Sequence, residues 1–323
     1  MTSRRGMSLV EVCVVIAILG LLAAILLPAV QIGRETSRRM ECSSHLRQIG
    51  TAVNNYHSTF NCFPPISGHV NNLPKSIWAN LLLDLGLVDL AAYDRSYGTS
   101  TATMTMDDYP EIKFPTALMQ CPSDSCPVSF GANYGANLLG SGAYYFPDGG
   151  QREDPFQGIG VFGGACNYST ITDGASNTTL ASEFLRGTGS PYTPLGVRIA
   201  DISRPKSLIF NLIPGATTNA EIEELRSRCR DSNPTTDPII SDTRGQFWLS
   251  GTQHDYVYSH FDTPNSFSCQ ESGYPRGLIL TVSSQHTGGV NVVYADGSVR
   301  FVSDSIDLKV WRALGTRAGN EQL

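Results

Sequence analysis

The sequence has few charged residues and no excess of basic ones. Of its 323 residues 16% are charged, and 29 acidic against 23 basic side chains give a formal charge of −6. Binding nucleic acid requires a basic surface that neutralises phosphates, so we expect no nucleic-acid partner. The sequence also contains no HExxH, GxSxG, P-loop or EF-hand pattern, the signatures of several large enzyme and calcium-binding classes. We therefore expect that the protein is not an enzyme and needs no cofactor.

Long apolar runs are absent after residue 30, which excludes a protein with several membrane-spanning helices. The run that is present covers residues 9–30, and about 20 residues are enough to cross about 30 Å of hydrocarbon. Arg4 and Arg5 precede it, so the positive-inside rule predicts a cytoplasmic N terminus. We expect a single-pass inner-membrane protein whose head lies in the periplasm or outside the cell. The alternatives are a buried core helix and a cleaved secretory signal, whose apolar core is shorter, about 7–15 residues.

Residues 6–11, GMSLVE, follow two arginines and open the apolar run. This arrangement resembles the leader of type IV prepilins and type II secretion pseudopilins. The resemblance implies that residues 1–6 are a leader, that a prepilin peptidase cuts after Gly6, and that the new N-terminal Met7 is methylated. It also implies that Glu11 pairs with the free amine of a neighbouring subunit. Such a partner would explain a carboxylate whose placement in a membrane helix costs on the order of 1–3 kcal/mol.

The apolar run continues into an amphipathic segment. Apolar side chains recur there at spacings of 4, 3, 4 and 3 residues, as on one face of a helix. These positions are Cys42, Leu46, Ile49, Val53 and Tyr56. We expect one helix of about 72 Å from Leu9 to Tyr56, with a kink at Pro28. Residues 7–30 would be its membrane and assembly part, and residues 31–63 its amphipathic continuation. A globular head is expected to cover the stripe, although a plain stalk fits the same pattern.

Residues 64–323 are expected to form an α+β head. Pro64 and Pro65 end the helix, and short β-rich segments follow. The clearest is residues 290–302, where two β-rich runs flank Asp296-Gly297, the signal for a tight hairpin. The predicted fold is therefore a long N-terminal helix packed on an antiparallel sheet. A charged stretch between residues 186 and 242 suggests a surface insertion with one short helix.

His286 stands ten residues before Asp296, in the pattern H-x9-DG. Further motifs are CPSD at residues 121–124, ITDGASNT at residues 171–178, and CSSHLRQIGTAVNNYHSTFNCFPP in the predicted helix. Together they resemble the DUF1559 family of prepilin-type proteins, which carry a C-terminal H-x9-DG domain. The resemblance implies an architecture and an export route, with the H-x9-DG hairpin at residues 286–302. It implies no biochemical activity.

Asp173 and His286 are the motif residues that a metal ion would use. Some major pseudopilins bind calcium in a carboxylate-rich loop, for which Asp148, Asp154 or Asp173 would serve. A catalytic zinc usually needs three protein ligands and calcium needs about six to eight oxygens, and the spacing specifies neither. We favour a structural hydrogen bond from His286 to a loop, and we expect no bound metal.

The sequence has eight cysteines. Cys13 lies in the predicted membrane segment, and the others lie on the side of the membrane where disulfides form. The pairs expected first are Cys121–Cys126 and Cys229–Cys269. Reduced, buried cysteines are the alternative.

These features together predict a prepilin-like structural subunit of a type II secretion or type IV pilus-like assembly. Its expected partners are the prepilin peptidase, the inner membrane, and like or related pilin-type subunits that contact its N-terminal helix. A membrane-tethered binding module that uses the leader only for export is the alternative from another class. A tethered hydrolase is the third, and it would need a nucleophile near His286 that the sequence does not supply.

Overall fold

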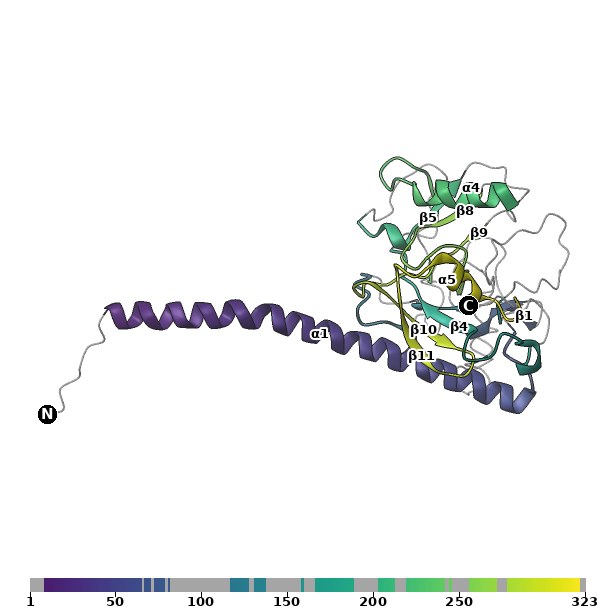
Figure 1. Ribbon diagram of the computed structural model, residues 1–323, viewed down its shortest axis with the longest axis horizontal. Coiled ribbons are helices and arrows are strands. Elements are labelled where there is room, and N and C mark those ends of the chain that lie inside the picture. Colours follow the sequence, from purple (N-terminus) through teal and green to yellow (C-terminus); the bar gives the residue numbers. More distant parts are fainter. Residues whose placement is uncertain are drawn as a thin grey trace.

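The computed structural model describes the long N-terminal helix and the core of the head. The described residues are 9–65, 67–70, 73–78, 81, 117–127, 131–137, 158–159, 166–188, 203–212, 219–241, 244–245, 256–271 and 278–319. In Figure 1 one long helix projects from the head, and only its C-terminal half is covered by the head. The fold is α+β, a long helix packed on a sheet, as the sequence predicts.

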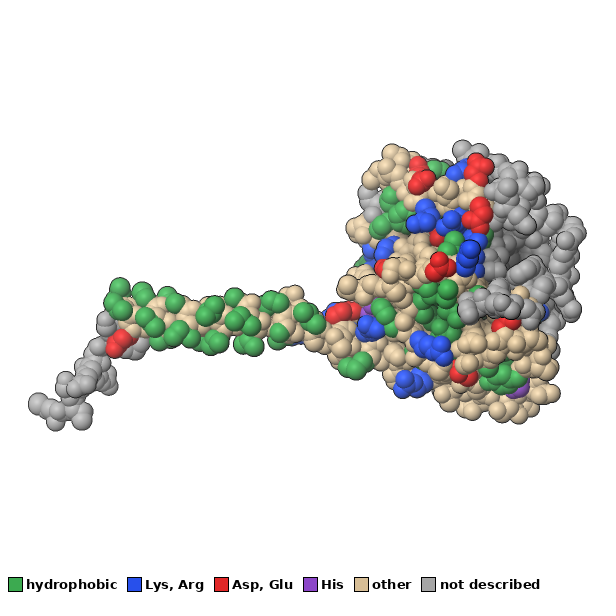
Figure 2. All heavy atoms as spheres, in the orientation of Figure 1, with side chains coloured by type: hydrophobic (Ala, Val, Ile, Leu, Met, Phe, Trp, Pro, Cys, Tyr) green, Lys and Arg blue, Asp and Glu red, His purple; other side chains and the backbone are tan. Residues whose placement is uncertain are grey.

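Helix α1 runs from Leu9 to Phe60 and continues through Pro28. At 1.5 Å per residue its 52 residues span about 78 Å. Residues 9–34 are exposed, and the exposed large apolar side chains there include consecutive residues such as Val14, Val15 and Ile16, so they lie all round the helix. Figure 2 shows those on one face. Among the described residues, α1 is the one helix that is long and apolar enough to cross a membrane. A helix that is apolar all round requires an apolar environment, which a membrane provides.

The second half of α1 is amphipathic, and the head covers its apolar stripe. The buried residues are Cys42, Leu46, Ile49, Gly50, Ala52 and Val53. Four of these belong to the predicted stripe, while Tyr56 is only partly buried. The helix ends four residues beyond the predicted end. Asn61 adopts a left-handed conformation, with φ of 56°, and its N–H donates to the carbonyl of His57 at 2.7 Å, as is common after a helix C terminus.

A five-stranded sheet packs against α1. Its strands are β3 (Tyr134–Asn137), β4 (Thr179–Glu183), β7 (Val257–Tyr258), β10 (Gly289–Tyr294) and β11 (Val299–Ser303), in the order β11-β10-β4-β3-β7. The pairings are antiparallel except that of β3 with β7, which is parallel. Strands β10, β11 and β4 lie against α1.

The predicted hairpin is formed by β10 and β11, with Val290 opposite Val302. Its turn contains Asp296 and Gly297, and φ of Gly297 is +83°, a conformation that favours glycine. This turn lies against α1 at Gly50. A Cβ atom at Gly50 would lie 2.8 Å from Val293 Cγ2 and 3.3 Å from Gly297 Cα. The absence of a side chain at Gly50 therefore allows the helix and the hairpin to approach closely.

A second sheet lies on the side of the head away from α1, and α4 packs beside it (Figure 1). Its strands are β5 (Ile209–Leu212), β6 (Ile239–Ser241), β8 (Ser268–Glu271) and β9 (Leu278–Ile279), in the order β6-β5-β8-β9. Helix α4, Asn219–Arg230, is the short helix predicted from the charged stretch. The region expected to be a surface insertion also supplies β5 and β6, and β5 pairs with β8 from the C-terminal part of the chain. It is therefore part of a folded layer.

The remaining elements are short. They are β1 (Ser67–Val70), β2 (Leu73–Ser76), the 3-10 helices η2 (Ala117–Met119), η3 (Tyr168–Thr170) and η4 (Pro205–Ser207), and α5 (Leu308–Gly315). The carboxylate of Asp307 caps α5 by accepting from the N–H groups of Lys309 and Val310. Trp311 of α5 is buried in a cluster with Val290 and Val292 of β10.

Candidate functional site

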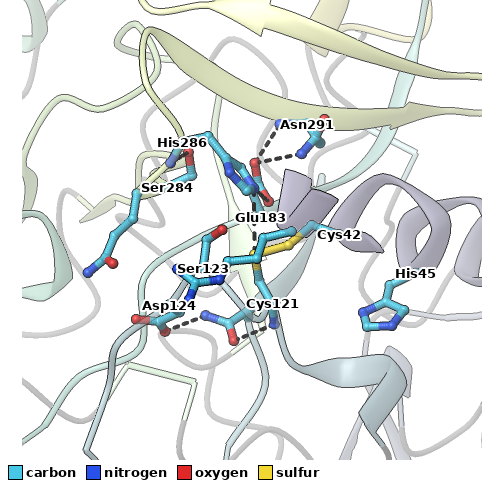
Figure 3. The surroundings of a disulfide bond; sticks show 12 residues. Cys42, His45, Cys121, Ser123, Asp124, Glu183, Ser284, His286 and Asn291 are labelled. Atoms are coloured by element: carbon cyan, nitrogen blue, oxygen red, sulfur yellow. Dashed lines mark hydrogen bonds and ion pairs between the residues drawn. A yellow bond between two sulfur atoms is a disulfide. The ribbon is translucent and has the colours of Figure 1, made fainter. Parts of the chain in front are cut away.

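The candidate site lies where α1 enters the head, and a disulfide joins the two there (Figure 3). Cys42 is the first buried residue of α1 and is bonded to Cys121, with their Cα atoms 5.2 Å apart. Three residues further along the helix, Nδ1–H of His45 donates to the carbonyl of Gln120 at 3.1 Å. The loop that follows η2 is thus held on the helix by a covalent bond and a hydrogen bond.

The pairing of Cys121 with Cys126 expected from the sequence is wrong. Cys126 donates its thiol to the carbonyl of Gly187 at 3.5 Å. The apolar stripe of α1 instead presents Cys42, 79 residues earlier in the chain, to Cys121. The other expected pair is present in the structure: Cys229 of α4 is bonded to Cys269 of β8, with Cα atoms 5.9 Å apart.

The imidazole of His286 lies between two carboxylates beside this disulfide. His286 is in the loop between β9 and β10 and is 3% exposed. Its Nδ1 lies 2.7 Å from Oε1 of Glu35 on α1, and its Nε2 lies 3.4 Å from Oε2 of Glu183 on β4. The same Nε2 is 3.6 Å from Sγ of Cys121. One ring therefore contacts the helix, the sheet and the disulfide.

Glu183 is the most deeply buried carboxylate beside this ring, with 1% of the residue exposed. Its Oε1 accepts from the backbone N–H of Asn291 at 2.6 Å and from the amide Nδ2 of the same residue at 3.2 Å. Its Oε2 has no hydrogen-bond partner and faces Nε2 of His286. The β10–β4 pairing places Asn291 next to this carboxylate, since Val292 lies opposite Ser182.

The two carboxylates set the protonation of His286. Burial alone would lower its pKa, but the interactions with the negatively charged Glu183 and Glu35 outweigh that effect. The pKa of the imidazole therefore lies above its ordinary value. A protonated ring forms ion pairs with both carboxylates, so it bridges the helix and the sheet.

A buried charge cluster adjoins the disulfide on the head side. Asp124 is 8% exposed and forms ion pairs with Arg204 and with Nε of Arg186, the latter at 3.2 Å. The amide of Asn133 connects this cluster to the disulfide, because its Nδ2 donates to Asp124 and its Oδ1 accepts from the N–H of Cys121 at 3.0 Å. Two arginines against one aspartate leave a formal charge of +1 beside the carboxylates.

Motif segments that are far apart in the sequence meet at this site. The helix motif contributes Cys42, the CPSD segment contributes Cys121 and Asp124, and the H-x9-DG segment contributes His286. The strand that follows the ITDGASNT segment contributes Glu183. Residues from several of the motifs shared with the DUF1559 family therefore lie together in one buried site.

The two ends of the H-x9-DG pattern do not meet. His286 precedes β10 and Asp296 follows it, so the six residues of the strand separate them. The carboxylate of Asp296 accepts from the N–H of Ser298 at 2.9 Å within the hairpin turn. Gly297 packs near Asn54 of α1. The DG end of the pattern therefore makes a turn that contacts the helix.

Asp173 is not brought to His286. Its Oδ2 accepts from the N–H of Gly319 at 2.7 Å and from the hydroxyl of Thr316 at 3.2 Å, so it holds the segment after α5. The calcium candidates Asp148 and Asp154 lie outside the described residues.

The leader residues are only partly described. Gly6 and Met7 lie outside the described residues, while Glu11 lies in the first turn of α1 and is exposed. Among the acidic residues that the structure describes, Glu11 alone lies within the apolar, exposed part of the helix, from Leu9 to Ile32.

The two carboxylates beside His286 were not predicted from the sequence. Glu183 had a usable signal, because it is the ionisable residue in the otherwise uncharged run TLASEFL. A charge in a buried strand generally has a specific partner. Glu35 had no such signal, since it lies among several charged residues of an expected helix surface.

The site combines a carboxylate and an imidazole, which bind protons, with two cysteine sulfurs, which are reduced or oxidised as a pair; all of these groups can also bind a metal. One atom each of Cys42, Cys121, Glu183 and His286 lies within 4.8 Å of the others, and all four residues are buried. With the sulfurs bonded to each other, the remaining polar pair is the carboxylate and the imidazole.

A family model described as a protein of unknown function, DUF1559, matches residues 31–309. The match covers the second half of α1, the site and most of the head. No curated protein and no solved structure matches the chain.

Proposed function

Because the chain belongs to the DUF1559 family of proteins of unknown function, its role has to be inferred from its own residues, and we propose that it is a prepilin-like structural subunit. In this proposal the protein is held in the inner membrane by α1 and is cut after Gly6 by a prepilin peptidase. It then joins a type IV pilus-like or type II secretion assembly by contacts of its N-terminal helix with like or related subunits.

The observation that carries the proposal is the exposed apolar half of α1. None of its most apolar stretch is buried by the head, and Figure 2 shows apolar side chains along the whole projecting part. Burying apolar surface is worth roughly 25 cal/mol per Å², so such a helix is stable only in a membrane or against other apolar helices. A subunit that moves from a membrane into a helical bundle uses both environments.

Glu11 supports assembly over simple anchoring. A carboxylate in the apolar part of a membrane helix is costly and generally has a charged partner or a function. In the proposed assembly its partner is the amine of Met7 in the neighbouring subunit. The pair would set the register between adjacent helices.

The disulfides support a head on the outer side of the membrane. The disulfide Cys42–Cys121 joins α1 to the head, and Cys229–Cys269 joins two elements within the head. Disulfides persist in oxidising compartments such as the periplasm and are rare in the cytosol. Arg4 and Arg5 favour the same orientation by the positive-inside rule.

The test compares the N terminus of the membrane-extracted protein in wild type and three variants, produced with and without a prepilin peptidase. We expect Met7 as an N-methylated first residue in the wild type, and an uncut chain in Gly6→Ala. Glu11→Ala is expected to be cut but to lose cross-links between subunits through the helix. Gly20→Ala is the matched control, since a Cβ atom at Gly20 meets no atom within 4 Å. An intact Met1 in the wild type in the presence of the peptidase would refute the proposal.

The second candidate is a membrane-tethered binding module that uses the leader only for export. The second sheet and α4 favour it, because they lie on the side of the head away from α1 and are not needed to cover the helix (Figure 1). This candidate predicts cleavage after Gly6 without helix-to-helix cross-links. Sedimentation of the cleaved protein in detergent distinguishes the two, with a monomer at all concentrations supporting the module.

A further inference from the structure

Two of the distances beside the Cys42–Cys121 disulfide match those between the ligands of a tetrahedral metal site. Zinc lies about 2.0–2.3 Å from its ligands, so two ligands on a tetrahedron are about 3.3–3.8 Å apart. Nε2 of His286 lies 3.4 Å from Oε2 of Glu183 and 3.6 Å from Sγ of Cys121. With the sulfur of Cys42 added, the group has one ligand atom from each of four residues, and these four atoms all lie within 4.8 Å of one another.

The surrounding contacts orient these atoms toward a common centre. Metal-bound histidines usually donate their other ring N–H to a carboxylate, and bound carboxylates are held by hydrogen bonds of their own. Nδ1 of His286 contacts Glu35 at 2.7 Å, which leaves Nε2 directed inward. Asn291 holds Oε1 of Glu183 with two hydrogen bonds, which leaves Oε2 directed inward.

Oε2 of Glu183 supplies an independent indication of a ligand. It is a buried carboxylate oxygen without a hydrogen-bond partner, in a residue that is 1% exposed. The ion pair with His286, whose Nε2 lies 3.4 Å away, gives this oxygen no hydrogen bond, and a metal ion bound between the two atoms would provide a direct ligand contact.

We propose that Cys42, Cys121, Glu183 and His286 bind one zinc ion when the two cysteines are thiols. Two thiolates and a neutral imidazole favour zinc over calcium or magnesium, which prefer oxygen ligands. The two thiols release their protons as the ion binds, a protonated His286 also releases the proton on Nε2, and no electron is transferred. Two thiolates and one carboxylate give the zinc site a net charge of −1, which the Asp124–Arg186–Arg204 cluster, at +1, balances.

The zinc-bound and disulfide forms exclude each other. In the disulfide the sulfurs are bonded to each other at 2.09 Å and are no longer thiolates. The newly made chain carries thiols, so zinc binds before a disulfide oxidant has removed two electrons and two protons from the pair. Either form joins α1 to the loop after η2. The site therefore locks the helix onto the head in two chemically different ways.

The test uses the full chain in detergent, reduced with a phosphine under nitrogen. The phosphine takes oxygen from water and leaves two thiols for each disulfide. Cobalt(II) is then added as a coloured substitute for zinc. We expect one equivalent to give the thiolate-to-cobalt absorption and the visible bands of a tetrahedral ion, and zinc to displace it. The oxidised chain is expected to give neither signal.

Four variants locate the metal. We expect Cys42→Ser, Glu183→Gln and His286→Gln each to weaken binding by about 100-fold or more, and Glu35→Gln, which acts through His286, by about tenfold. Circular dichroism of the oxidised Glu183→Gln and His286→Gln proteins checks that both fold.

The other cysteines need a control because reduction also affects them. The chain with Cys126→Ser and Cys229→Ser is expected to bind cobalt like the wild type. Binding that survives both Cys42→Ser and His286→Gln would place the ion elsewhere and overturn the proposal. A reduced wild-type chain that binds less than stoichiometric metal also overturns it, whether or not that chain keeps its fold.

Discussion

Stability of the head should fall as the pH is lowered through the range in which exposed histidines become protonated, because His260 is buried as a neutral ring. Nδ1–H of His260 donates to the carbonyl of Trp311 at 2.7 Å, so Nε2 accepts from the hydroxyl of Thr179 at 2.7 Å. That hydroxyl accepts in turn from the amide of Asn137 at 3.0 Å and the phenol of Tyr258 at 3.2 Å. A second proton on the ring would have no acceptor in this network.

The magnitude follows from the difference between folded and unfolded pKa values. Burial lowers the pKa of His260 to about 3, despite the opposing hydrogen bond to Trp311. An unfolded histidine has a pKa of about 6.5. The stabilisation is complete above about pH 6.5 and is lost as the pH falls toward about 3, because the unfolded chain then binds a proton that the folded one does not. Relative to pH 7.5, the expected loss at pH 5 is about 2 kcal/mol.

The assay is urea unfolding of the full chain in detergent, followed by tryptophan fluorescence, at pH 7.5 and pH 5. Trp311 is a suitable reporter because its ring centroid lies 3.8 Å from that of His260. His260→Gln keeps a donor and an acceptor but does not titrate. It separates this effect from the other groups, including His286, whose raised pKa acts in the opposite direction. The stability difference between wild type and variant should shrink by about 2 kcal/mol at pH 5. A difference that does not change with pH would refute the reasoning.

Three further substitutions test how much the disulfide at α1, the contact of α1 with the hairpin, and the cap of α5 each contribute to stability. Cys42→Ser should lower the free energy of unfolding in urea by about 4 kcal/mol, because its disulfide closes a loop with a sequence separation of 79. Gly50→Val should cost about 2 kcal/mol in thermal unfolding, since its Cβ would lie 2.8 Å from Val293, whereas Gly20→Val should leave the head unchanged. Asp307→Ala should cost about 1 kcal/mol by removing the cap of α5, measured by the same unfolding curves.

The parts of the fold that depend on neighbours in the sequence were predictable. The period of the stripe from Cys42 to Val53 predicted the buried face of α1, and the two β-rich runs that flank Asp296-Gly297 predicted the β10–β11 hairpin. Both patterns extend over several turns or pairs, so one unusual residue does not hide them. The close contact at Gly50 was not predicted, because it depends on a hairpin that lies more than 200 residues later in the sequence.

The site was predictable only in part. His286 was identified through its motif, but neither of its carboxylate contacts was. Glu35 and His286 are separated by 251 residues, and no local pattern in the sequence links two such positions. The disulfide partner of Cys121 was missed for the same reason. The sequence prediction paired Cys121 with Cys126, while the three-dimensional packing of α1 brings Cys42 to Cys121.

The position of the Cys42–Cys121 bond along α1 determines how the head responds to mechanical tension. A pull on the projecting end of the helix reaches its covalent connection to the head at Cys42, where the buried stripe begins. There the force passes through a covalent bond directly to the loop after η2. The chain between the two cysteines, whose sequence separation is 79, is then a closed loop that carries no tension, although this loop contains the rest of α1. The packing of the stripe on β10 and β11 is therefore shielded from being peeled apart residue by residue.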